Sequence, residues 1–80
     1  MNIHIYIIIY IIIKIIKFFI MKIHRNIVDY ISKNKVITTS ELAKFLKVSW
    51  NTAEKYLLEL AVEGEVLKLK KEGVNLWILK

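Results

Sequence analysis

Few side chains in this chain have the types and spacing that support catalysis or metal binding. Its 80 residues include two histidines, His4 and His24, and no cysteine. Without further ligands or an H-E-x-x-H spacing, these histidines cannot complete a zinc site, and each is interpreted as a bystander. The sequence has no glycine-rich phosphate loop, and its scattered serines lack histidine and carboxylate partners. We therefore predict a protein that is not an enzyme and that uses no metal or cofactor.

The remaining chemistry is that of a basic, polar surface. Thirteen lysine and arginine residues against seven acidic residues give a formal net charge of +6. This balance modestly favours polyanionic partners. The absence of cysteine excludes disulfide bonds and fits a reducing, intracellular compartment. A chain of this length is large enough for one domain, which hydrophobic packing alone must hold together.

The first twenty residues differ in composition from the rest. Eleven of them are isoleucine, and Gly, Ala, Leu, Val, Ser, Asp and Glu are absent. About 20 apolar residues can span a bilayer core, and the positive charges of Lys17, Lys22 and Arg25 would keep the rest of the chain in the cytoplasm. Lys14 interrupts the run, at a cost of roughly 2.5 to 3.5 kcal/mol for a charge at depth. One interpretation of residues 1–20 is thus a membrane anchor.

The interpretation that we place first concerns the gene. Ile, Lys, Asn, Tyr and Phe are encoded by A/T-rich codons, so upstream noncoding DNA read in frame would give such a segment, and Met21 would be the natural start. A cleaved secretory signal fits poorly, because the charges follow the apolar run and no small-residue cleavage site is present. An added helix or strand for dimerisation is a third interpretation. We accordingly divide the chain into an Ile-rich segment, residues 1–20, and a domain, residues 21–80.

The first part of this domain shows the periodicity of two short helices. Apolar side chains recur at helical spacing up to about Asn34. A brief β-favouring segment at residues 36–37 leads to a cluster of capping residues, of which Thr39 or Ser40 is expected to cap the second helix. That helix is two turns long and turns one apolar side inward. The inward residues are Leu42, Ala43, Phe45 and Leu46.

A third helix and a hairpin are expected to complete the domain. Ser49 is placed to cap this helix, which runs to about Glu63 and is stopped by Gly64. Its expected inward residues are Ala53, Leu57, Leu60 and Ala61. Two apolar segments then flank a turn at residues 71–73, and the second, from residue 75 to 80, is too apolar to be a free edge strand. The sequence therefore predicts a mainly α fold with a small β-hairpin.

The order and the motifs of these elements resemble a known family. Three helices and a hairpin, with a short link between the second and third helices, are the order of a winged helix-turn-helix. Residues 39–79 resemble the winged helix domains of archaeal and bacterial transcription regulators, in the pattern S-E-L-A-K-F-L-x-V-S-x-x-T-A-x-K-x-L-x-x-L-x-x-x-G-x-V. The resemblance implies three helices and a two-stranded wing that bind double-stranded DNA in the cytoplasm as a small transcription regulator.

The resemblance also implies which residues contact DNA. In the family, the third helix enters the major groove and its N-terminal residues approach base edges, which here are Trp50, Asn51, Thr52 and Lys55. Asn51 has the amide geometry to read adenine, and Thr52 suits a phosphate or a thymine methyl group. Lys55 stands where the family often has arginine, so it can neutralise phosphate without the planar fork that suits guanine. Ser49 could offer its hydroxyl and the helix amides to a phosphate, besides its role as a cap.

Five lysines are expected to place positive charge on both sides of the third helix. They are Lys44 and Lys47 beside the turn, and Lys68, Lys70 and Lys71 along the wing. Any of these residues could instead be a solvated surface side chain. For Trp50, an exposed aromatic side chain that departs from the family pattern, the alternative to a base or sugar contact is packing on Lys47, Val48 or the first twenty residues.

Two alternative functions stay open. In the first, the winged helix is a protein-interaction module that docks through Trp50 and the apolar hairpin. In the second, residues 1–20 tether a DNA-binding regulator to the membrane as a single-pass anchor. In either DNA-binding case we expect a homodimer, because one small module makes few base contacts, although residues 21–80 show no evident dimerisation element.

Overall fold

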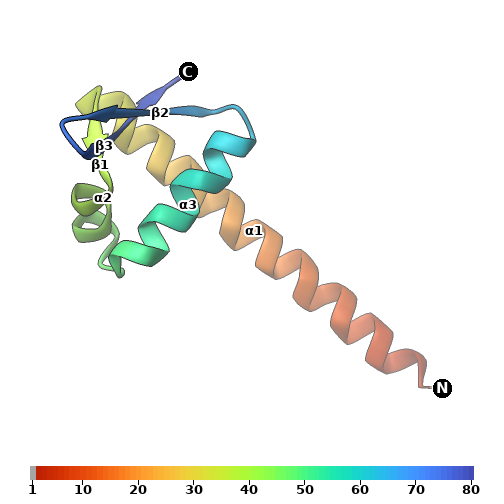
Figure 1. Ribbon diagram of the computed structural model, residues 1–80. Helices are drawn as coiled ribbons and strands as arrows, with labels where there is room; N and C mark the ends of the chain where they lie inside the picture. The colour runs from red at the N-terminus through yellow and green to blue at the C-terminus, as the bar shows by residue number, and fades with distance from the viewer. Residues whose placement is uncertain (1) are drawn as a thin grey trace.

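The computed structural model describes residues 2–80 and places three helices around a small antiparallel sheet. The helices are α1 (Ile3–Asn34), α2 (Thr39–Leu46) and α3 (Trp50–Val62), and the strands are β1 (Ile37–Thr38), β2 (Val66–Lys71) and β3 (Val74–Leu79). Figure 1 shows the other elements gathered at the C-terminal half of α1, while its N-terminal half projects away from them. The predicted mainly helical winged helix fold, preceded by an Ile-rich segment, is confirmed.

α1 is one continuous helix that crosses the predicted boundary at Met21. The Asn2 side chain caps its start by accepting a hydrogen bond from the backbone N–H of His4 at 3.0 Å. Its end is set by Lys35, whose backbone has φ 69° and donates to the carbonyl of Ile31. The two halves of α1 differ in burial, because every buried residue of this helix lies at position 24 or later.

The cap of α2 is Thr38, so the prediction of Thr39 or Ser40 was wrong by one or two residues. The Thr38 hydroxyl accepts from the backbone N–H of Glu41 at 3.1 Å, and the Glu41 carboxylate accepts from the backbone N–H of Thr38 at 3.0 Å. This reciprocal pair is a capping box. Thr39 is instead 2% exposed, because its side chain turns into the core. Ser49 caps α3 as predicted, accepting from the backbone N–H of Thr52 at 3.2 Å.

The core lies where α1, α2, α3 and the sheet meet. Its fully buried large side chains are Trp77, Ile27, Ile31, Ile37, Leu42, Leu57, Leu60 and Val66. Burial of such apolar side chains is the main stabilising contribution in a domain without disulfide bonds. Phe45, which was expected to face inward, is half exposed and stacks on Tyr30 of α1 with ring centroids 4.1 Å apart.

The hairpin of the wing gains a third strand from the segment before α2. β3 is central in the order β1-β3-β2, with Ile37 opposite Trp77 on one side and Lys68 opposite Trp77 on the other. The apolar character of β3 follows from this central place. The hairpin turn is Glu72 and Gly73, with φ 51° and 80°, one residue shorter than predicted because Lys71 still pairs with Val74. Positive φ at both turn residues is typical of the tight hairpin turn whose twist matches that of the strands.

Candidate nucleic-acid interface

The start of α3 is a hydrogen-bonded cap whose hydroxyl groups are already engaged. The hydroxyls of Ser49 and Thr52 lie 2.9 Å apart, in addition to the bond from the Thr52 backbone N–H to the Ser49 hydroxyl. Ser49 is exposed and Thr52 is half-buried. Both residues therefore lie at the predicted end of the helix, where their hydroxyls bond to each other.

Asn51 and Lys55 are exposed, one turn apart, on the outer side of α3. Together with Glu54 they line one end of an open groove along this helix, whose far end is formed by Leu58, Glu59, Val62 and Glu63. The N-terminal end of the groove therefore combines an amide with one positive and one negative charge, whereas the C-terminal end is apolar and acidic. A polyanion is attracted more to the end that carries Lys55 than to the end that carries Glu59 and Glu63.

Two carboxylates of α3, and a third at its C-cap, contact partners from other elements. Glu54, with a side chain only 13% exposed, accepts a hydrogen bond from the Thr39 hydroxyl at 2.8 Å and lies 3.5 Å from the ammonium group of Lys68. The Thr39 hydroxyl accepts in turn from the indole N–H of Trp77 at 2.9 Å. This chain of contacts joins α2, α3 and both strands of the wing.

The carboxylates of Glu59 and of the C-cap residue Glu63 lie beside His24 of α1. Its Nε2 lies 3.0 Å from Glu59 Oε2 and its Nδ1 3.5 Å from Glu63 Oε2. The imidazole ring also meets Tyr56 edge to face, with ring centroids 6.5 Å apart. Sequence analysis assigned His24 no catalytic or metal-binding role and missed this structural contact, because packing of α1 on α3 brings together residues that lie 35 positions apart.

The turn between α2 and α3 presents both of its predicted lysines to solvent. Lys44 is exposed in the last turn of α2. Lys47 is exposed and ends the helix in the left-handed conformation, with φ 58°, while its backbone N–H bonds to the carbonyls of Ala43 and Lys44. A left-handed residue at this place lets the chain reverse toward α3 within three residues.

The three lysines of the wing do not share one face. In the register of β2 and β3, Lys68 pairs with Trp77 and Lys70 with Asn75, on the side of the sheet that faces the core. Lys68 is held there by Glu54 and lies 5.5 Å from the centre of the Trp77 ring. Lys71 pairs with Val74 and points to the opposite, outer side. Lys70 therefore lies on the side of α3, whereas Lys71 lies with the exposed Leu67 and Leu69.

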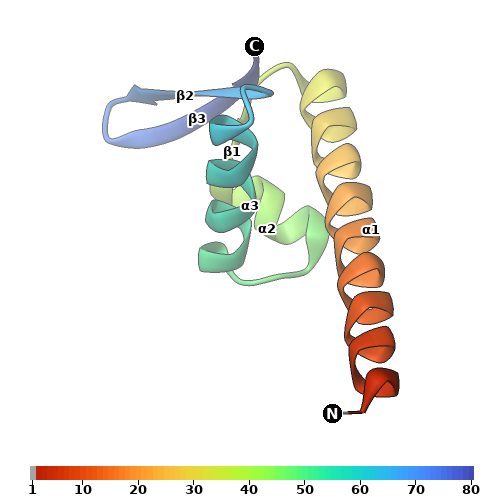
Figure 2. The same cartoon turned by 90° about the vertical axis from the view of Figure 1, so that its right-hand side faces the viewer.

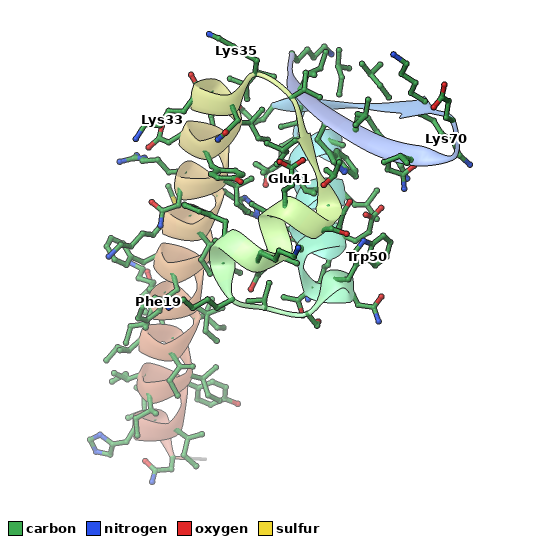
Figure 3. All side chains as sticks on the ribbon, turned by 90° about the vertical axis from the view of Figure 1, so that its left-hand side faces the viewer. Phe19, Lys33, Lys35, Glu41, Trp50 and Lys70 are labelled. Carbon is green, nitrogen blue, oxygen red and sulfur yellow. The ribbon has the colours of Figure 1, made fainter. Side chains whose placement is uncertain are left out.

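Trp50 is 47% exposed and lies beside the tip of the wing. It lines a shallow groove of about 210 Å³ together with the start of α2 and the hairpin residues Gly73, Val74 and Asn75. Figure 3 shows Trp50 and Lys70 on the same side of the domain, away from α1. The alternative that Trp50 meets the first twenty residues was therefore wrong. Asn75 was missed by sequence reasoning, although its alternation with Trp77 would have assigned it to this face.

Among residues 2–80 the structure forms no group of three His, Cys, Asp or Glu side chains suited to a metal ion. The candidate surface is instead one of hydrogen-bonding and cationic groups. Figure 2 shows its layout, with the wing extending from one side of α3 and α1 packed on the other. A recognition helix framed by a turn and a wing defines the class of winged helix-turn-helix proteins.

Residues 22–64 match the family model described as winged helix-turn-helix DNA-binding. This match covers more than half of the 80 residues, so the chain belongs to the winged helix-turn-helix DNA-binding family. No curated protein sequence and no solved structure matches the chain. Its function is DNA binding as a winged helix regulator, in a family typically without enzymatic activity.

Proposed function

We propose that residues 21–80 bind double-stranded DNA with α3 in the major groove and the inner side of the wing along the phosphate backbone. The observation that carries this proposal is the charge arrangement of α3. Glu54, Glu59 and Glu63 each contact a partner in another element, whereas Asn51 and Lys55 are exposed at the N-terminal half and make no such contact. An α-helix of this kind fits the major groove, where asparagine can pair with adenine.

The five lysines have three different roles in this proposal. Lys44 and Lys47 beside the turn, with Lys70 on the inner side of the wing, flank α3 and are placed to neutralise phosphates. Lys68 is held by Glu54, so we assign it to positioning of the wing. Lys71 lies on the outer side and contributes to the general positive field alone.

Trp50 and the cap of α3 complete the proposed interface. Trp50, at the rim of the groove below the wing tip, is placed to pack on a sugar or base. The hydroxyls of Ser49 and Thr52 bond to each other, so a phosphate here would be held chiefly by backbone N–H groups of the helix start. Such a protein works in the compartment that holds the DNA, which is the cytoplasm of an archaeal or bacterial cell.

The test is a gel shift of the full chain with random and genomic duplexes over a range of salt concentrations. Lys55→Ala should weaken binding to every duplex and lower the slope of log affinity against log salt by about one, because one phosphate contact is lost. The matched control is Lys33→Ala, which removes the same charge from the far side of α1 (Figure 3). Equal slopes for the two variants, or binding that does not respond to salt, would refute the proposed docking.

The exposed apolar side chains of the wing favour a second candidate, a protein-interaction module. Leu67 is 40% exposed and Leu69 is 45% exposed, both on the outer side of the hairpin. Trp50 lies at the tip of the same hairpin, next to its inner side. A protein partner on this outer side would leave α3 free for DNA.

Analytical ultracentrifugation of the full chain tests the homodimer that we propose for sequence-specific binding, and a monomer at all concentrations, with and without DNA, would contradict it.

A further inference from the structure

The N-terminal half of α1, residues 3–20, lies outside the folded domain. All of its eleven isoleucines are exposed, from 39% for Ile20 to 68% for Ile3. Figures 1 and 2 both show the N-terminal end of α1 projecting beyond all the other elements. Contiguous apolar surface of this extent is unfavourable in water, so the segment requires a covering partner.

The distribution of the isoleucines decides what kind of partner fits. They surround the helix, because they occupy positions 7 to 9, 11 to 13, and 15 and 16, as well as 3, 5 and 20. A coiled coil with a second copy covers a narrow seam and needs polar flanks. A helix that is apolar on nearly all sides is covered only by an environment that surrounds it, such as a bilayer.

The length and the charges of the segment fit the same environment. Eighteen residues of helix extend about 27 Å, close to the roughly 30 Å of a bilayer core. Within residues 2–80, α1 is the one helix that is long and apolar enough to cross a membrane. Lys17, Lys22 and Arg25 lie at the domain end of this segment, and all three side chains are exposed. Basic residues at one end of an apolar helix face anionic headgroups on the cytoplasmic side of a membrane.

We propose that residues 3–20 embed in a lipid bilayer and hold the DNA-binding domain at the cytoplasmic membrane surface. Four of the five polar side chains of the segment form a narrow stripe, because Tyr6, Tyr10, Lys14 and Lys17 follow each other at intervals of four, four and three residues, and the fifth, His4, lies in the first turn. The ammonium group of Lys14 lies 4.6 Å from the centre of the Tyr10 ring, a cation–π contact that accompanies the lysine along the helix. The other sides of the helix remain apolar.

The continuity of α1 makes this anchor a rigid one. The same helix that carries the exposed isoleucines continues without interruption to the buried Ile27 and Ile31 of the domain core. No flexible linker separates the embedded segment from the domain. The bilayer therefore fixes the orientation of α3 as well as its distance from the membrane. This inference does not depend on how α3 contacts DNA.

The experiment is flotation of the full chain with vesicles of phosphatidylcholine and phosphatidylglycerol in a density gradient, followed by a wash in about 1 M NaCl, which screens charge attraction. The variant Ile9→Lys with Ile12→Lys places two charges in the middle of the segment, and the matched control is Ile9→Leu with Ile12→Leu. The wild type and the leucine variant should float and resist the wash. The lysine variant should partition into lipid at least about a hundredfold less.

Other outcomes overturn the proposal. The proposal fails if the wild type stays at the bottom of the gradient, if salt releases it from the vesicles, or if the lysine variant floats equally well. It also fails if the full chain forms an oligomer that does not bind vesicles, or if the mass of the native protein shows that it begins at Met21. Ile9 and Ile12 lie outside the core, so all three chains should unfold at the same temperature and bind DNA equally. Loss of DNA binding without loss of flotation would refute the proposed function alone.

Discussion

At the scale of single residues, the polar network under the wing has the largest effect on the candidate surface. Glu54 would oppose DNA if its carboxylate were free at the start of a recognition helix. It accepts from Thr39 and lies beside Lys68 instead, so its charge is compensated within the domain. Trp77, fully buried and central in the sheet, orients Thr39 for this role through its indole N–H. The same contacts hold the ammonium group of Lys68 near Glu54.

Thr39→Val should destabilise the domain by about 1 to 3 kcal/mol, because the Trp77 indole N–H and the Glu54 carboxylate would each lose a buried hydrogen-bond partner. Urea denaturation followed by circular dichroism measures the loss. Thr39→Ser is the matched control, since it keeps the hydroxyl and removes only a methyl group. If the valine and serine variants unfold at the same urea concentration, the hydrogen bonds contribute nothing and the network argument fails.

At the scale of elements, His24 connects the long helix to the recognition helix. It is 9% exposed and approaches one carboxylate with each ring nitrogen. The contact fixes α3 against α1 on the side opposite to the wing. It also keeps the carboxylates of Glu59 and Glu63 near α1, at the end of the open groove that is remote from Asn51.

His24→Leu should lower the free energy of unfolding by about 1 kcal/mol, because the hydrogen bond to Glu59 is lost at a part-buried site. The control is His4→Leu, a change of the same type at an exposed position of the projecting half of α1, which should leave the midpoint of urea denaturation unchanged. A similar midpoint for both variants would show that the bond between α1 and α3 does not stabilise the domain.

At the scale of the whole molecule, the folded unit and the projecting helix are separable. Every residue of the hydrophobic core lies at position 27 or later, and the partly buried residues around it begin at Ile23. Residues 2–20 therefore contribute no side chain to this core, although α1 runs through both parts.

A chain of residues 21–80 should fold with the same core and bind DNA with the same salt dependence as the full chain. Thermal unfolding by circular dichroism and a gel shift compare the two. The shorter chain should also stay in solution without detergent, because the exposed isoleucines are removed. Failure of this chain to fold would show that the projecting helix contributes to the domain and would contradict the division at Met21.

The sequence by itself determined most of the fold, because the signals involved are local. Helical periodicity, the cap at Ser49 and the stop at Gly64 act over a few residues, and they placed α3 and its exposed Asn51 and Lys55 correctly. The central position of β3 was reflected in its apolar composition, and the errors of one or two residues at Thr38 and at the hairpin turn are typical of element boundaries.

Only the tertiary structure decided which charged residues face the proposed partner. The pairs Lys68 with Glu54, His24 with Glu59, and Trp77 with Thr39 join residues 14, 35 and 38 positions apart. Strand register and helix packing create such contacts, and a register shift of one residue would exchange Lys70 and Lys71 between the two sides of the wing. Local sequence patterns do not extend over these separations, so five equivalent lysines in the sequence became, in the fold, residues with different neighbours.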